Sequence, residues 1–425
     1  MKADISIPSL SLSRLFSLIV IYLAAASCTT TKRVSAFLIV PGTPKTSYNF
    51  PLHAEKETKI STSAPPSAAE TPTTPTIVDR STLTLLEHIN FNIPNHDFAV
   101  PFYYDILGCG FDPRMAENIQ LNKDRDKQPE AGSTIWANCG ASQFHLCYNG
   151  TEPTLQGRIG LRYDSLEELQ RRLQQHHQET LEKEDQRCFQ SYTIDKDSRG
   201  NKQITIVDRY DNVFLCQMAL NPHPDAPVAS LKQPIVAHVD HFIPSLNPPD
   251  SETALWEDLA CRFGRERSEC QGVTFVEVDC PRGTAIDIAT FYESVFDATT
   301  TVIPMQEHHI AMIAFGNIDQ EGRADQYLLF KEQSTPVTRN IGHHIAMYVG
   351  ETAADFEQAY KNAEIAGVIW INPRFADKVD SLPAAKQEKQ FRFKNIVDLK
   401  TGKTVMEIEQ EVRSVEHPSF PGHSS

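Results

Sequence analysis

Residues 85–111 first follow the period of a strand and then that of a helix. In segment 88–93 the polar residues fall on one face of a strand and the apolar residues on the other, so the pattern predicts a strand here. Apolar residues then recur at helical spacing: Phe98, Phe102, Tyr103, Ile106 and Leu107. This spacing predicts a short helix, and Gly108 and Gly110 are typical of a helix end.

The same order of a strand, a helix and further strands recurs three times along the chain. These units are predicted to begin with strands at 158–162, 274–280 and 344–349, followed by helices at 165–182, 285–296 and 353–365. Their remaining strands, and those of the first unit, are predicted at 134–141, 142–149, 203–208, 213–219, 299–303, 309–315, 326–331, 367–372, 390–397 and 404–411. The third unit repeats the Phe-Tyr pair of the first, and the same distance back from this pair lies Glu277, where the first unit has His88.

The strand, the helix and the Phe-Tyr-x-x-x-Leu-Gly ending at 102–108 resemble the start of a βαβββ unit of the vicinal oxygen chelate superfamily, which includes glyoxalases, bleomycin resistance proteins and extradiol dioxygenases. The resemblance covers about residues 84–220 and 273–412. It implies an α+β fold in which four βαβββ units pair into two cup-shaped domains of mixed sheet, because one unit alone leaves half its sheet uncovered.

The expected domains follow the order of the units along the chain. The first paired domain is predicted over 83–220 and the second over 273–412, with a tail at 413–425. Residues 221–272 are predicted to form a connector, which contains a strand at 236–243 and a helix at 252–263.

In the superfamily, each unit offers metal ligands near the start of its first strand and on its last strand. In the second domain this resemblance selects Glu277, His344 and Glu407 as ligands of a divalent metal such as Fe, Mn, Ni or Zn. Glu409 lies on the same strand face as Glu407, so the register of the last strand stays open.

The first domain offers a less complete set. His88 and His145 occupy the two positions of the first unit, but the positions of the second unit fall near Arg158 and Leu215, which have no donor for a metal. The two histidines can instead be hydrogen-bonded pocket residues, with Arg158 as a clamp for a carboxylate or phosphate. His309 is a further candidate, as a general base.

The resemblance implies a metal-dependent lyase, isomerase or dioxygenase that acts on a small, oxygen-rich organic substrate. The alternatives are a metal-free protein that binds small molecules and a structural protein, because the fold does not decide among them. A net charge of −15 over 425 residues argues against nucleic acid as a partner. Nine cysteines without a C-x-x-C pair give no sign of a zinc ribbon or a disulfide framework. The oligomeric state stays open.

The amino terminus has the pattern of a cleavable leader over residues 1–36. An apolar run at 15–28 follows basic residues and is short for a membrane span, so no stable span is expected once the leader is removed. Residues 34–37 partly match the cleavage motif of bipartite plastid-targeting leaders of algae. Entry into the secretory pathway and then the plastid is therefore predicted, with secretion, the ER lumen or an uncleaved anchor as alternatives. Residues 37–82, rich in Ser, Thr and Pro, are predicted to be a disordered linker.

Overall fold

The computed structural model describes a defined set of residues: 77–94, 96–112, 134–148, 154–197, 200–218, 268–305, 308–319, 322–335, 337, 343–373 and 378–420. The chain divides into two units at residues 70 and 71, and all of the described residues belong to the second unit. The predicted leader, nearly all of the predicted linker, and the strand and helix predicted within the connector lie outside the described residues.

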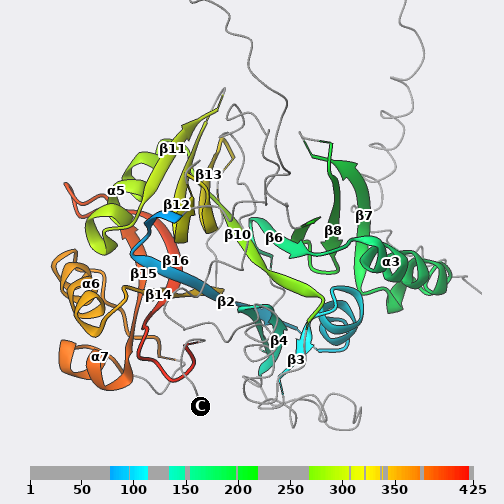
Figure 1. Ribbon diagram of the computed structural model, residues 1–425, viewed down its shortest axis with the longest axis horizontal. Helices are drawn as coiled ribbons and strands as arrows, with labels where there is room; N and C mark the ends of the chain where they lie inside the picture. The colour runs from blue at the N-terminus through cyan, green and yellow to red at the C-terminus, as the bar shows by residue number, and fades with distance from the viewer. Residues whose placement is uncertain are drawn as a thin grey trace, which may run out of the picture. The chain divides into compact units, whose positions relative to one another are not determined.

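Four units of strand, helix and strands follow one another along the chain (Figure 1). The first contains β2 (Leu83–Ile93), the π-helical turn η1 (Pro101–Ile106), β3 (Gly110–Phe111), β4 (Thr134–Cys139) and β5 (Ser142–Tyr148). The second contains β6 (Gly157–Tyr163), α3 (Glu167–Glu179), η3 (Glu184–Gln186), β7 (Phe189–Lys196), β8 (Lys202–Asp208) and β9 (Val213–Met218). The third contains β10 (Cys270–Pro281), α5 (Ala285–Phe296), β11 (Thr300–Pro304), β12 (His309–Asp319) and β13 (Ala324–Gln333). The fourth contains β14 (His344–Val349), α6 (Ala353–Ile365), α7 (Leu382–Glu388), β15 (Gln390–Val397) and β16 (Thr404–Ser414).

The units pair into two mixed sheets, which confirms the predicted α+β class and the βαβββ units. One sheet has the strand order β15-β16-β14-β2-β5-β4-β3 and joins the first unit to the fourth. The other has the order β1-β12-β13-β10-β6-β9-β8-β7, with β11 paired to β12, and joins the second unit to the third. We call these the first/fourth sheet and the second/third sheet. Figure 1 shows β2, near the start of the described chain, beside β14 from its last quarter.

This pairing differs from the expected one. The order of the units along the chain predicts that consecutive units pair, the first with the second and the third with the fourth. The antiparallel contacts β2–β14 and β6–β10 instead join the outer two units to each other and the inner two units to each other. The pattern of polar and apolar residues in a strand predicts which of its faces is buried. It does not predict which other unit supplies the neighbouring strand. Residues that the sequence places in different domains therefore share a sheet.

Several elements also differ in detail from the sequence expectation. β1 (Ile77–Arg80) pairs with β12, so the predicted linker does not extend to residue 82. The helix with the Phe-Tyr pair is π-helical, and it starts at Pro101. β7 and α7 were not predicted. The strand predicted at 367–372 is reduced to a single bridge between Ile369 and Phe393.

Both sheets bury an apolar face in one continuous core. From the first/fourth sheet this core receives side chains such as Phe91, Phe144 and Met347, all fully or almost fully buried. The two sheets are also tied by a polar contact, because the Gln326 amide of β13 donates to the carbonyl oxygens of Leu86 (3.2 Å) and Val273 (2.7 Å). The opposite face of the first/fourth sheet is buried as well, but its side chains are polar and charged, and this face carries the site.

Candidate metal centre

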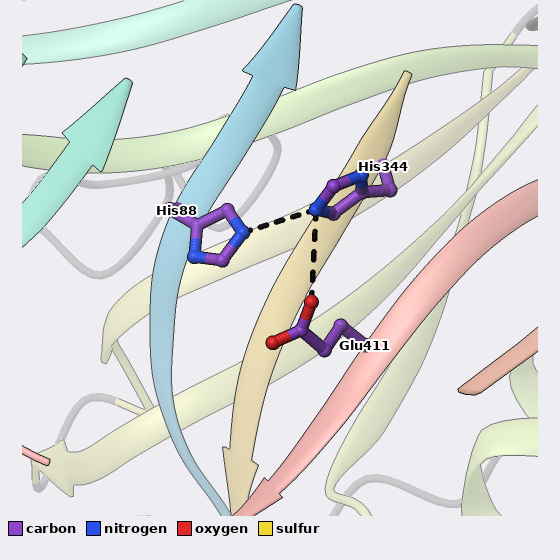
Figure 2. A group of neighbouring side chains, drawn as sticks. All are labelled: His88, His344 and Glu411. Atoms are coloured by element: carbon purple, nitrogen blue, oxygen red, sulfur yellow. Dashed lines mark hydrogen bonds and ion pairs between the residues drawn. The ribbon is translucent and has the colours of Figure 1, made fainter. Parts of the chain in front are cut away.

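His88 and His344 meet on the polar face of the first/fourth sheet. They lie on the adjacent antiparallel strands β2 and β14, where His88 is paired with Ala346 and Asn90 with His344. The Nε2 atoms of the two imidazoles are 3.1 Å apart, and both side chains are almost completely buried. Glu411 of β16, opposite Ala346, places a carboxylate oxygen 3.7 Å from Nε2 of His344 (Figure 2). Among the described residues this is the one group of three potential ligands whose donor atoms all lie within 4.8 Å.

The strand register gives these residues an internal two-fold relationship. An axis between β2 and β14 that exchanges His88 with His344 also exchanges Asn90 with Ala346. Asn90 is paired with His145 on β5, and Ala346 with Glu411 on β16, so the same axis exchanges His145 with Glu411. The four positions are thus the first strand and the last strand of each unit in the sheet, and they hold three histidines and one glutamate.

The buried carboxylate of Glu87 sets the tautomer of His88. Three consecutive residues of β2 face only two of β14, so Glu87 is the extra residue of a bulge that puts it beside His88. Nδ1 of His88 lies 2.7 Å from the Glu87 carboxylate, which can only accept, so Nδ1 donates and Nε2 presents its lone pair toward His344. Burial and the nearby Arg413 hold the pKa of His88 well below its usual range, so the ring is neutral at pH 7.

Two buried arginines hold Glu411. Arg392 and Arg413 both form ion pairs with its carboxylate, and Arg413 also donates to Glu87 (2.7 Å). Burial alone raises the pKa of Glu411, but Arg413 and Arg392 outweigh burial and keep the pKa well below the usual range. Arg392 further contacts Glu409, whose carboxylate accepts from the amide of Asn372 (2.6 Å).

The spacing and chemistry of the donors fit a divalent metal. Ligands about 2.1 Å from one ion lie roughly 3.0 Å apart when octahedral and roughly 3.4 Å apart when tetrahedral. The distance of 3.1 Å between the two Nε2 atoms meets this requirement, that of 3.7 Å from Nε2 of His344 to Glu411 is a few tenths of an ångström longer, and all three donor atoms lie within 4.8 Å of one another. Two imidazoles and one carboxylate that leave other positions open form the ligand set of many catalytic metal sites.

His145 lies in a stack of rings beside the cluster. Its ring is sandwiched between His88, at a centroid distance of 3.7 Å, and Trp136, at 4.7 Å. Nε2 of His145 donates to the side-chain amide oxygen of Gln143 (3.1 Å), which leaves Nδ1 with the lone pair. Burial, followed by the neighbouring His88, lowers the pKa of His145 well below its usual range. His145 is therefore a neutral base within reach of the same site.

The expected triad of Glu277, His344 and Glu407 is not brought together. Glu277 lies on β10 in the second/third sheet, where Arg158 of β6 contacts both of its carboxylate oxygens at 2.9 and 2.6 Å. Arg158 thus clamps a carboxylate of its own chain. Glu407 is on β16 and pairs with Lys394 (3.6 Å) at the edge of the site.

His309 is not part of the His88–His344–Glu411 cluster either. It begins β12 in the second/third sheet, and it contacts Glu332 through its backbone N–H (3.0 Å) and through Nδ1 (3.3 Å). The corresponding face of the second/third sheet carries an apolar cluster around Phe275, Tyr327 and Leu329. The side-chain cluster with metal-ligand geometry is therefore in the sheet that joins the first unit to the fourth.

Glu411 and Glu87 are the two residues that sequence reasoning missed. Glu411 shares its strand face with Glu407 and Glu409, so alternation alone left three candidate registers on one strand. Only the pairing with Ala346 identifies it. Glu87 falls on the apolar side of a regular strand, and no feature of the sequence indicates the bulge that turns it toward His88.

Comparisons with known proteins find similarity in structure but not in sequence. No protein family model matches the chain, and no curated protein is similar to it in sequence. Glyoxalase I from Zea mays is similar at 11% identity, covering 77% of this chain and 92% of its own, with a TM-score of 0.41. A 2,2',3-trihydroxybiphenyl 1,2-dioxygenase from Sphingomonas wittichii is similar at 11% identity over 78% and 90% of the two chains, with a TM-score of 0.24.

A search of the described residues for membrane spans finds no helix that is both long and apolar enough to cross a bilayer.

Proposed function

We propose that the first/fourth sheet binds one divalent metal ion through His88, His344 and Glu411, and that the protein is a metal-dependent lyase, isomerase or dioxygenase. The observation that carries this proposal is the buried His88–His344–Glu411 cluster, whose donor atoms have the spacing of ligands to one ion. A metal bound there would supply a Lewis acid that polarises two neighbouring oxygen atoms of a small organic substrate.

The residues around the cluster have distinct roles in this proposal. Glu87 orients His88 through Nδ1, so that its lone pair points into the site. Arg392 and Arg413 hold Glu411 as a carboxylate in a buried place, where an isolated charge is costly. His145, which is neutral and has a free lone pair on Nδ1, is placed to take up or return a proton, or to add a fourth ligand.

A metal-free role remains the second candidate, because one observation favours it. Glu411 already has two guanidinium partners, so a metal must share this carboxylate with Arg392 and Arg413. If no metal binds, the polar face would instead bind a small oxygen-rich ligand through hydrogen bonds, as a binding protein does.

Metal reconstitution separates the two candidates. The full chain is stripped with a chelator, reconstituted with Fe(II), Mn(II), Ni(II), Co(II) or Zn(II), desalted and measured by elemental analysis. We expect one equivalent of metal in the unmodified protein and less than a tenth of this in His344→Ala. Addition of acetohydroxamate, a bidentate oxygen ligand, should change the visible spectrum of the Co(II) form. Failure of every ion to bind at one equivalent would leave the metal-free binding protein as the better description.

Localisation is part of the same proposal but rests on the sequence alone. We propose a cleaved leader and delivery through the secretory pathway to a plastid. A fluorescent fusion of the full chain, compared with a fusion that lacks residues 1–36, tests this directly.

A further inference from the structure

Three buried cysteines from separate elements meet where the two sheets join. Cys109 follows η1, Cys139 ends β4, and Cys270 begins β10. The Sγ atoms of Cys139 and Cys270 are 2.7 Å apart, and Cys109 lies beside this pair. Cys139 and Cys270 are completely buried, whereas Cys109 keeps 6% of its surface exposed.

The backbone around this pair is held in place independently of the thiols. Gly140 and Gly272 form an antiparallel bridge. Gly140 has a φ of +58°, and a Cβ at this position would lie only 1.7 Å from the carbonyl oxygen of Gln271. The Ser268 hydroxyl accepts from the backbone N–H of Gly140 (3.0 Å) and donates to the carbonyl oxygen of Cys270 (2.6 Å). These contacts hold the segments that carry Cys139 and Cys270 side by side.

The separation of the two sulfur atoms distinguishes a redox pair from a metal site. Two cysteine sulfurs on one zinc ion, each about 2.3 Å from the metal, lie about 3.8 Å apart. A disulfide bond is about 2.05 Å long. At 2.7 Å the atoms Sγ of Cys139 and Sγ of Cys270 are closer than shared zinc permits. The geometry thus favours bond formation between them.

We propose that Cys139 and Cys270 form a reversible disulfide that links the two sheets, with Cys109 as the thiol through which oxidation enters. The oxidant is hydrogen peroxide. The Cys109 thiol loses its proton and its Sγ attacks one peroxide oxygen, the O–O bond breaks, a sulfenic acid forms, and the hydroxide released takes up the proton as one water. The Cys270 thiol then displaces the hydroxyl group as a second water and forms an S–S bond with Cys109. Attack of Cys139 on the Cys270 sulfur transfers this bond to the buried pair and returns Cys109 as a thiol. Two thiols thus lose two electrons and two protons to one peroxide.

Such a bond would act on the stability of the chain. It would join residues that are 131 positions apart, and thus restrict the unfolded chain over a long loop. It would also fix the end of β4, the strand that carries Trp136 beside His145. The proposed disulfide is independent of the proposed metal site, because none of the three cysteines belongs to the His88–His344–Glu411 cluster.

Peptide mapping of the full chain tests the proposal without any variant. The reduced protein is treated with hydrogen peroxide at a few equivalents, remaining thiols are alkylated, and the digest is analysed by mass spectrometry without reduction. We expect the peptides of Cys139 and Cys270 as one linked species, reversed by dithiothreitol, while Cys188 and Cys280 are alkylated. A melting temperature about 5 °C or more above that of the reduced form should accompany the bond.

Variants then assign the roles of the three thiols. Cys109→Ser should slow formation of the Cys139–Cys270 bond at least tenfold but leave its final yield unchanged, and Cys280→Ser is the buried control with unchanged rate and yield. Full alkylation of Cys139 and Cys270 after peroxide treatment would overturn the proposal. Stoichiometric zinc lost on Cys139→Ser, with no linked peptide in the metal-free chain, would also overturn it.

Discussion

The Nε2 atoms of His88 and His344 lie 3.1 Å apart, although 256 positions separate the two residues in the chain. This contact joins the first strand of the first unit to the first strand of the last unit. It exists because the outer units share one sheet and the inner units share the other. The site is therefore built from strands near the two ends of the described chain, and the predictions below depend on this arrangement.

Removal of a donor from the cluster should abolish metal binding, whereas removal of the originally expected carboxylates should not. We expect His88→Ala, His344→Ala and Glu411→Gln each to retain less than a tenth of the metal of the unmodified protein, because two remaining donors hold an ion poorly. Glu277→Gln and Glu407→Gln are matched controls that should keep one equivalent. Elemental analysis after desalting provides the measurement, and metal loss in Glu407→Gln with full retention in Glu411→Gln would contradict the assignment.

Glu87→Gln should weaken the metal without removing it. The amide can accept through its oxygen but can also donate through its nitrogen, so it no longer fixes His88 with Nδ1 as donor. Such changes beside a ligand typically weaken metal binding about 10- to 100-fold. Competition with a chelating dye measures the affinity. The comparison with Glu351→Gln, an exposed carboxylate, controls for loss of one negative charge. An unchanged affinity in Glu87→Gln would show that the bulge has no part in the site.

Arg158 and Glu277 should contribute to stability as a pair. Glu277 is buried and Arg158 is partly exposed, so Arg158→Leu leaves a buried carboxylate without its partner. We expect this variant to lose about 2 kcal/mol of unfolding free energy, and Arg158→Leu/Glu277→Leu to recover at least half of that loss. Urea unfolding measures both values, with metal content expected to remain at one equivalent. Additive losses in the double variant would show that the two residues are not coupled.

The metal-free protein should lose stability through His145 as the pH falls. Burial lowers the pKa of His145 in the folded state, so below pH 6.5 the unfolded chain binds a proton that the folded chain does not. The unfolding free energy of the unmodified protein should therefore fall relative to that of His145→Gln, by up to about 1.4 kcal/mol per pH unit below 6.5.

The difference between the two proteins is the quantity to measure. Asp208 and Asp325 have pKa values raised to about 7 by burial, and these two groups lower stability as the pH rises from 4 to 7. Their opposite effect cancels in the comparison of the unmodified protein with His145→Gln. Parallel urea midpoints of the two proteins between pH 7 and pH 5 would contradict a lowered pKa of His145 in the folded protein.

Local patterns in the sequence were enough to predict most strands and helices within each unit. Alternation along β2, β14 and β15 and the helical spacing of α5 and α6 come from the burial of one face, and this requirement is written into consecutive residues. Three of the four positions related by the two-fold axis, His88, His145 and His344, could be found in the same way. Each lies at a fixed place within its own unit, so no knowledge of neighbouring units was required.

Tertiary structure alone decided which units share a sheet and therefore which donors meet. Edge pairing depends on the fit of whole units, and a strand pattern is the same whichever strand lies beside it. For this reason Glu277 came to pair with Arg158, and the place expected for it beside His344 was taken by His88. The choice of Glu411 over Glu407 likewise depends on the parallel register of β16 against β14, and the orientation of Glu87 depends on a bulge. Both are properties of strand contacts, which consecutive residues do not encode.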